Sequence, residues 1–238
     1  MLRQNAWIAG LAALAACSSS TGPEGTGRLT VQLVGRAASA TPALETTDDV
    51  LTITSVQVVA RKIRLERTSD GCGSGEPPEG QSAECSDLRL DPMLLEPPLD
   101  GTTEATFTVD LPEGTYRSLM LQIHKPSNAN EDAAFLADHP NFAGLSLRVV
   151  GSFNGEDFTF ESALTAVVEI ALDTPVEIEA ETPAAVTLAL DVAAWFAADA
   201  GGLLDPIDPT QQIRSRIEQN IRASFHAFRD HDGDGAPD

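Results

Sequence analysis

Residues 229–238 place carboxylates at every second position of a short segment. The oxygen donors that this segment offers are Asp230, Asp232, Asp234, the backbone carbonyl of Ala236, and Asp238. Calcium is a hard cation that takes six to eight oxygen ligands, and alternating carboxylates in a tightly turning loop converge on one point. Gly235 permits the sharp bend after the third carboxylate. The spacing therefore predicts a calcium loop, and the alternative is a solvated acidic tail.

The pattern resembles the first two thirds of an EF-hand loop, and equally the DxDxDGxxD repeats of thrombospondin type 3 and dockerin-like segments. An EF-hand also has a bidentate glutamate at its twelfth position and an exiting helix. Here the ninth position, Asp238, is the last residue. The departure predicts weak, structural calcium binding in the sub-millimolar to millimolar range of extracellular modules, without the opening motion of a sensor.

The other residue types that could act in catalysis or bind a metal do not form a known sequence motif. The four histidines are His124, His139, His226 and His231, and no pair has the spacing of HExxH. Neither a GxSxG elbow nor a phosphate-binding Gly-Lys-Thr loop occurs. Trp195 and Phe196 could form an exposed platform for sugar, or could close one end of the fold. We therefore expect no enzyme, and a surface hydrolase is the least favoured alternative.

The first residues resemble the export signal of bacterial lipoproteins. Arg3 precedes an apolar stretch over 6–16 that is too short to be a permanent membrane span. Leu14-Ala15-Ala16-Cys17 resembles a lipobox, which implies that residues 1–16 are removed and that Cys17 carries lipid. The absence of an aspartate after Cys17 implies delivery to the outer membrane, on its periplasmic or cell-surface face. The alternative is an ordinary secretory signal.

Residues 17–27 are small and polar and predict a flexible tether. The formal net charge of −21 argues against binding nucleic acid through basic patches. In an oxidising compartment Cys72 and Cys85 are expected to form a disulfide, which would stabilise the fold by roughly 3 kcal/mol. A metal-binding cysteine pair is the alternative.

Alternating apolar residues predict a mostly β fold. Leu29, Val31 and Leu33 set the pattern, which recurs in roughly nine short segments with turn residues between them. Asn154-Gly155 predicts a hairpin. We expect an antiparallel β-sandwich over 28–200, of the immunoglobulin or transthyretin-like kind. It would carry a long cysteine-containing loop over 67–104 and a short helix at 131–137.

The segment 209–228 predicts an amphipathic helix. Pro209 follows Asp208 as at a helix N-terminus. The apolar residues that recur at spacings of three or four are Ile213, Ile217, Ile221, Phe225 and Phe228. This apolar face is expected to dock on the sandwich, and binding of another protein is the alternative.

Three stretches together resemble the DUF4382-type domain of bacterial lipoproteins. They are GRLTVQLVG, DVLTITSVQVVARKIRLER and LPEGTYRSLMLQI, and the resemblance covers residues 28–124. It implies a β-sandwich without assigned catalysis. We therefore expect an outer-membrane lipoprotein that binds or adheres to a surface glycan or envelope protein. The alternative is a structural envelope component without a ligand pocket.

Overall fold

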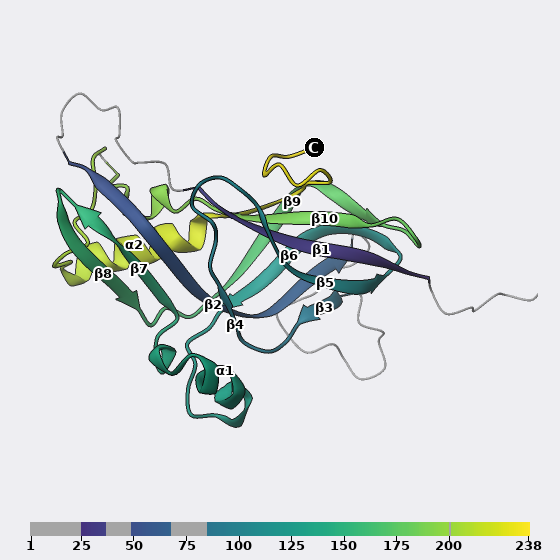
Figure 1. Cartoon of the computed structure of the whole chain (residues 1–238), viewed down its shortest axis with the longest axis horizontal. Helices are drawn as coiled ribbons and strands as arrows, with labels where there is room; N and C mark the ends of the chain where they lie inside the picture. Colours follow the sequence, from purple (N-terminus) through teal and green to yellow (C-terminus); the bar gives the residue numbers. More distant parts are fainter. Residues whose placement is uncertain (1–24, 37–48, 68–84, 200) are drawn as a thin grey trace, which may run out of the picture.

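The computed structural model describes residues 25–36, 49–67, 85–199 and 201–238, with only the backbone for 85–87. The described part is mostly β (Figure 1). The strands are β1 (Thr26–Gly35), β2 (Leu51–Arg67), β3 (Cys85–Arg89), β4 (Met93–Leu95), β5 (Glu104–Pro112), β6 (Gly114–Ile123), β7 (Leu147–Phe153), β8 (Glu156–Ser162), β9 (Ala166–Ile178), β10 (Ala184–Leu190) and β11 (Phe225–Arg229). The helical segments are η1 (Asn130–Asp132), α1 (Ala133–Asp138), η2 (Pro140–Phe142), η3 (Ala193–Phe196) and α2 (Gln211–Ala223).

The strands form one mixed sheet and not the antiparallel two-sheet sandwich that was expected over 28–200. The sheet has eleven strands in the order β5-β1-β10-β11-β9-β6-β2-β7-β8, and both β3 and β4 pair with β2. It curls strongly, so that its inner face wraps around the main core (Figure 1). The prediction of a mostly β chain is confirmed, whereas the sandwich arrangement is corrected to a single curled sheet.

Two parallel pairings account for the difference. β1 lies parallel to β10 from Leu29↔Ala184 to Gly35↔Leu190, and β11 lies parallel to β9 at Ala227↔Leu172. Alternation along a strand reports which side chains face the core, but it carries no information about the direction of the neighbouring strand. The hairpin prediction is confirmed, because Asn154 and Gly155 have φ of 52° and 83° and join β7 to β8.

The predicted helix at 209–228 is shorter than expected. It begins after Thr210, whose Oγ1 accepts the N–H of Ile213 at 3.3 Å, and it ends at Ala223. Residues Phe225–Arg229 form β11 instead of the last helical turns. The residues of β11 fit both the spacing of a helix and the alternation of a strand, and the structure has the strand. Phe225 and Ala227 face the main core, while Phe228 packs on the opposite face of the sheet.

Helix α2 and the η3 turn close one end of the curled sheet, where β7 and β8 lie (Figure 1). Ile217 and Ile221 of α2 are fully buried in the main core, which confirms the docking interpretation of its apolar face. Trp195 and Phe196 are also fully buried. The indole N–H of Trp195 donates to Ser224 Oγ at 2.6 Å, so the aromatic pair closes the fold and offers no exposed platform.

A helical excursion leaves the sheet after β6 and returns at β7. Both ends of it bond to one residue of β2: the N–H of His124 donates to the Val59 carbonyl at 2.9 Å, and the N–H of Val59 donates to the Ser146 carbonyl at 2.8 Å. The excursion contains η1, α1 and η2, in agreement with the short helix predicted at 131–137. Phe135 and Phe142 pack on Val59 as a separate small cluster on the outer side of β2.

Candidate metal centre

The acidic segment follows a strand, and Asp230 anchors it to the sheet. Asp230 is fully buried. Its Oδ1 accepts the N–H groups of Gly233 at 2.8 Å and Asp234 at 3.1 Å. Its Oδ2 accepts the N–H of Gly235 at 3.1 Å and the hydroxyl of Thr187 at 2.7 Å. These four bonds fill the lone-pair sites of one carboxylate, so Asp230 shapes the loop and fastens it to β10.

The two other carboxylates of the group are exposed. Oxygens of Asp230, Asp232 and Asp234 all lie within 4.8 Å of one another. Asp232 Oδ1 accepts the N–H of Asp234 at 3.3 Å, and Asp234 Oδ1 accepts the N–H of Ala236 at 2.8 Å. The second oxygen of each exposed aspartate is therefore the ligand atom that a cation can reach with least disturbance of the loop.

The loop lies on the outer face of the sheet, above β10 and β1 (Figure 1). The hydroxyl of Thr103 donates to the Gly233 carbonyl at 2.6 Å, and Arg36 Nη2 donates to the Gly235 carbonyl at 3.3 Å. Beneath it, Val34, Ala189 and Phe228 form a small apolar cluster. Because β10 is covered on this face as well as toward the main core, six of its seven residues are buried.

Asp238 lies outside the group of three carboxylates. Its Oδ2 accepts the N–H of His231 at 2.9 Å and lies 3.3 Å from Arg229 Nε. This pairing folds the end of the segment back onto β11. The structure thus brings together Asp230, Asp232 and Asp234, while cation ligation by the Ala236 carbonyl and by Asp238 stays a prediction.

The chemistry of this donor set suits a hard cation. The exposed carboxylates of Asp232 and Asp234 repel each other and the nearby Asp230, and a divalent ion held by their second oxygens would relieve this repulsion. Gly233 and Gly235 have φ of 73° and 80°, which allows the tight turn that brings the carboxylates together. The aspartate spacing was sufficient to predict the group, whereas no local signal pointed to Thr187 as the partner of Asp230.

A second polar cluster, absent from the sequence-based predictions, lies at the base of the excursion. His124 Nε2 lies 2.7 Å from Asp132 Oδ1, and Asp132 Oδ2 accepts the N–H of Ser127 at 2.8 Å. Burial raises the pKa of Asp132, but the bonds from Ser127 and His124 outweigh it and leave that pKa below its ordinary value. Arg61 Nη1 lies 3.9 Å from the same carboxylate. The cluster fastens the excursion to β6 and β2.

Several predicted features lie outside the described residues. They are the signal segment 1–16, the lipidated Cys17, residues 17–24 of the tether, Cys72, and the side chain of Cys85. The loop predicted over 67–104 contains β3 and β4 in its described part. No helix in the described ranges combines the length and the apolar character needed to span a membrane.

Comparisons with protein-family models, with curated proteins and with solved structures find no match to this chain. The resemblance of residues 28–124 to the DUF4382-type domain therefore stays a prediction. The class that the described fold and site define is a curled, mixed β-sheet protein with a cluster of three aspartates on its outer face.

Proposed function

We propose that this chain is an exported, lipid-anchored binding or adhesion module whose acidic loop holds a structural calcium ion. The observation that carries the calcium part is the group of Asp230, Asp232 and Asp234, whose oxygens lie within 4.8 Å of one another on a loop fastened to β10. Calcium there would neutralise the exposed carboxylates and hold the loop over the apolar cluster beneath it.

The anchor part is supported by the Leu14-Ala15-Ala16-Cys17 sequence and by the polar tether that follows. A diacylglyceryl group on Cys17 would place the sheet at the outer membrane, with a surface glycan or an envelope protein as the partner. Two acyl signals are needed for stable anchoring. Mass spectrometry of the membrane fraction is expected to find an acylated Cys17 at the N-terminus, and an unmodified Met1 on soluble material would contradict it.

Thermal unfolding with calcium and with chelator tests the calcium ion. At a calcium concentration about tenfold above a millimolar dissociation constant, a ligand that binds only the folded state stabilises it by about 1.4 kcal/mol. For a domain of this size that corresponds to a rise of about 3–5 °C in Tm. Magnesium at the same concentration is expected to give a smaller rise, because it dehydrates reluctantly and demands a stricter geometry.

Two matched double variants locate the ion. Asp232→Asn with Asp234→Asn is expected to abolish the calcium-dependent rise and to leave Tm in chelator nearly unchanged, because both side chains are exposed. Glu156→Gln with Asp157→Asn removes the same charge from exposed residues of β8 and should keep the full rise. Equal melting curves of the wild type with calcium and with chelator would rule the ion out.

A further inference from the structure

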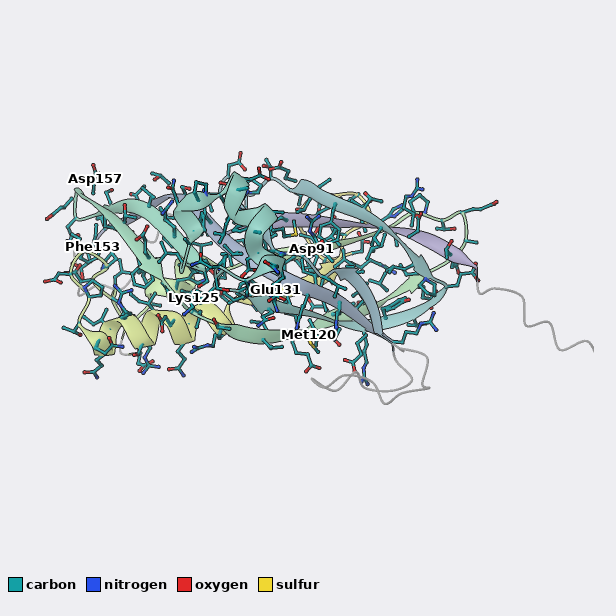
Figure 2. The ribbon with its side chains drawn as sticks, turned by 90° about the horizontal axis from the view of Figure 1, so that it is seen from below. Asp91, Met120, Lys125, Glu131, Phe153 and Asp157 are labelled. Atoms are coloured by element: carbon teal, nitrogen blue, oxygen red, sulfur yellow. The ribbon has the colours of Figure 1, made fainter. Side chains whose placement is uncertain are left out.

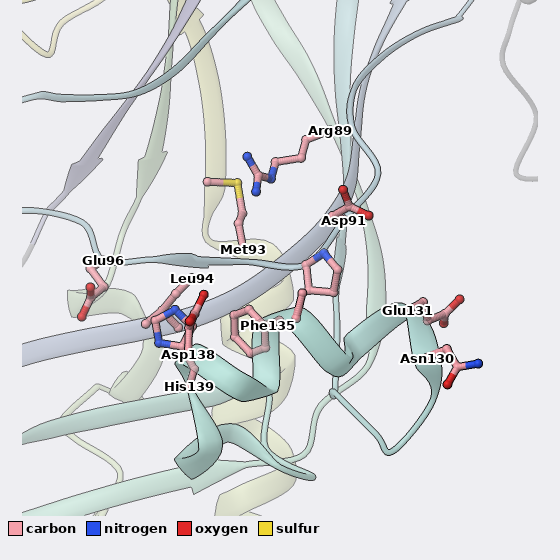
Figure 3. Close-up of a pocket in the computed structure, with 12 residues that line it drawn as sticks. Arg89, Asp91, Met93, Leu94, Glu96, Asn130, Glu131, Phe135, Asp138 and His139 are labelled. Atoms are coloured by element: carbon pink, nitrogen blue, oxygen red, sulfur yellow. The ribbon is translucent and has the colours of Figure 1, made fainter.

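A groove lies between the segment Arg89–Glu96 and the helical excursion (Figure 3). In Figure 1 the excursion with α1 lies at the bottom of the view and the C-terminal acidic loop at the top. The volume of the groove is about 680 Å³, within the usual range of ligand sites. Leu94 and Phe135 share one apolar cluster in this groove, and the ring of His139 lies 4.8 Å from the ring of Phe135. Met93 also lines the groove, but it packs on the main core.

Four carboxylates line this groove against a single arginine, Arg89. Two of the four are engaged: Glu131 pairs with Arg61 Nη1 at 2.7 Å, which lowers its pKa, and Glu96 accepts a bond from Gln57 Nε2 at 2.7 Å. The other two, Asp91 and Asp138, are exposed and have no side-chain partner within the described part of the chain.

The carboxylates of Asp91 and Asp138 lie on different sides of the apolar surface. Figure 3 shows Asp138 beside His139 to the left of the Phe135 ring, and Asp91 to its upper right. They also come from different elements, since Asp138 ends α1 while Asp91 lies between β3 and β4. A ligand that satisfies both must therefore carry positive charge and cross an apolar floor.

Strand β4 favours an extended ligand. Among the described strands it pairs only with β2, so no described strand bonds to its other edge. The N–H and carbonyl of Val59 are both bonded to the ends of the excursion, which makes Val59↔Leu94 a pair without mutual hydrogen bonds. The backbone N–H and carbonyl of Leu94 consequently point away from β2, where an added strand could bond to them.

The backbone of β2 is strained beside the groove. Lys62 has φ of 51°, and the pairing of β2 with both β3 and β6 shifts register there. The N–H of Lys62 donates to the Leu90 carbonyl at 3.4 Å, next to Arg89 and Asp91. Bulges are over-represented at sheet edges and next to active sites, and strained non-glycine residues cluster at active sites and ligand clamps.

We propose that this groove binds an extended peptide segment of a partner protein in which lysine or arginine alternates with large apolar residues. Asp91 and Asp138 would hold the cations, the side chains of Leu94 and Phe135, which share one apolar cluster, would contact the apolar side chains, and the backbone of Leu94 would bond to the peptide backbone. This inference rests on the binding role proposed above and assigns that role to a particular surface of the protein. Binding of the peptide does not require calcium.

Isothermal titration calorimetry in chelator tests it, with a capped hexapeptide of alternating leucine and arginine as the probe. One peptide is expected to bind per chain, and the amide signals of residues 89–96 and 130–139 are expected to shift in NMR spectra. Asp91→Asn with Asp138→Asn should weaken binding about five- to tenfold, the effect of losing two partly exposed ion pairs.

The matched control is Glu156→Gln with Asp157→Asn, which removes the same charge at the end of the β7–β8 hairpin. Figure 2 shows Asp157 at one end of the molecule, away from Asp91 and Glu131. This variant should change affinity less than twofold. The proposal would be overturned if both variants weakened binding equally. It would also be overturned if a serine–arginine or a leucine–glutamate hexapeptide bound as well as the leucine–arginine peptide, or if that peptide did not bind. None of these results bears on the calcium loop or on the lipid anchor.

Discussion

Two buried carboxylates, those of Asp230 and Asp132, hold segments that leave the sheet in place. Asp230 binds its own loop and Thr187 of β10, and Asp132 binds its own excursion and His124 at the end of β6. In each case backbone N–H groups supply donors that a loop would otherwise leave unsatisfied. Their loss is therefore expected to cost stability, whether or not a ligand is present.

Asp132→Asn tests this role at neutral pH. The amide cannot accept from both Ser127 and His124 as the carboxylate does, so the free energy of unfolding should fall by about 2 kcal/mol. Chemical denaturation with urea measures it. Asp138→Asn, an exposed change in α1, should stay within about 0.5 kcal/mol of the wild type.

The pH dependence has a definite sign. The pKa of Asp132 is lower in the folded protein than its ordinary value, so its contribution is fully present above the unfolded pKa of about 3.9 and is lost as the pH falls through the folded value. The difference between wild type and Asp132→Asn should therefore be constant near neutral pH and narrow below about pH 4. A difference that widens on acidification would contradict the assignment.

Helix α2 depends on packing for its place in the fold. Ile217 and Ile221 are fully buried in the main core, and Arg214 Nη1 donates to the Glu161 carbonyl of β8 at 2.6 Å. A helix of this length is marginal alone in water, so tertiary contacts supply most of its stability.

Ile221→Ala is expected to lower the free energy of unfolding by about 2–5 kcal/mol, because it removes buried methyl groups and leaves a cavity. Gln212→Ala, on the exposed side of the same helix, should change it by less than about 0.5 kcal/mol. Urea unfolding followed by circular dichroism compares the two. Similar effects of both variants would mean that α2 is not docked as the structure has it.

Local patterns predicted the elements better than their boundaries. Alternation identified most of the strands, but not β4 or β11, and Asn154-Gly155 identified the hairpin, since both signals follow from backbone geometry. The end of α2 was missed because Phe225 and Phe228 continue the helical spacing while also fitting a strand that is covered on both faces. The aspartate group was predictable from spacing alone, whereas His124–Asp132 and the groove arise only when distant segments meet.

The molecule as a whole is held together by pairings between segments far apart in the sequence. β1 pairs with β10 and β5, and β11 lies between β9 and β10. The periodicity of a sequence does not show which distant strands pair with each other. The expectation of a sandwich was therefore wrong, and the structure has a curled mixed sheet. Removing β11 would leave β9 and β10 with open edges in the middle of the sheet.

Two truncated chains test this arrangement. A chain that ends after Ser224 lacks β11 and is expected to lose its cooperative thermal transition and to aggregate. A chain that ends after Asp230 keeps β11 and should still unfold cooperatively, at a lower Tm than the full sequence. Circular dichroism melting and size-exclusion chromatography distinguish them, and indistinguishable behaviour of the two chains would argue against a central place for β11.

The position of β11 also bears on how the protein is made. Every other described strand emerges from the ribosome earlier, yet β11 belongs between two of them. During translation β9 and β10 must wait with unsatisfied backbone groups until residues 225–229 are available. If the chain is exported as we propose, such a delay would keep the nascent polypeptide unfolded, and so able to pass through a secretion channel, until β11 is available.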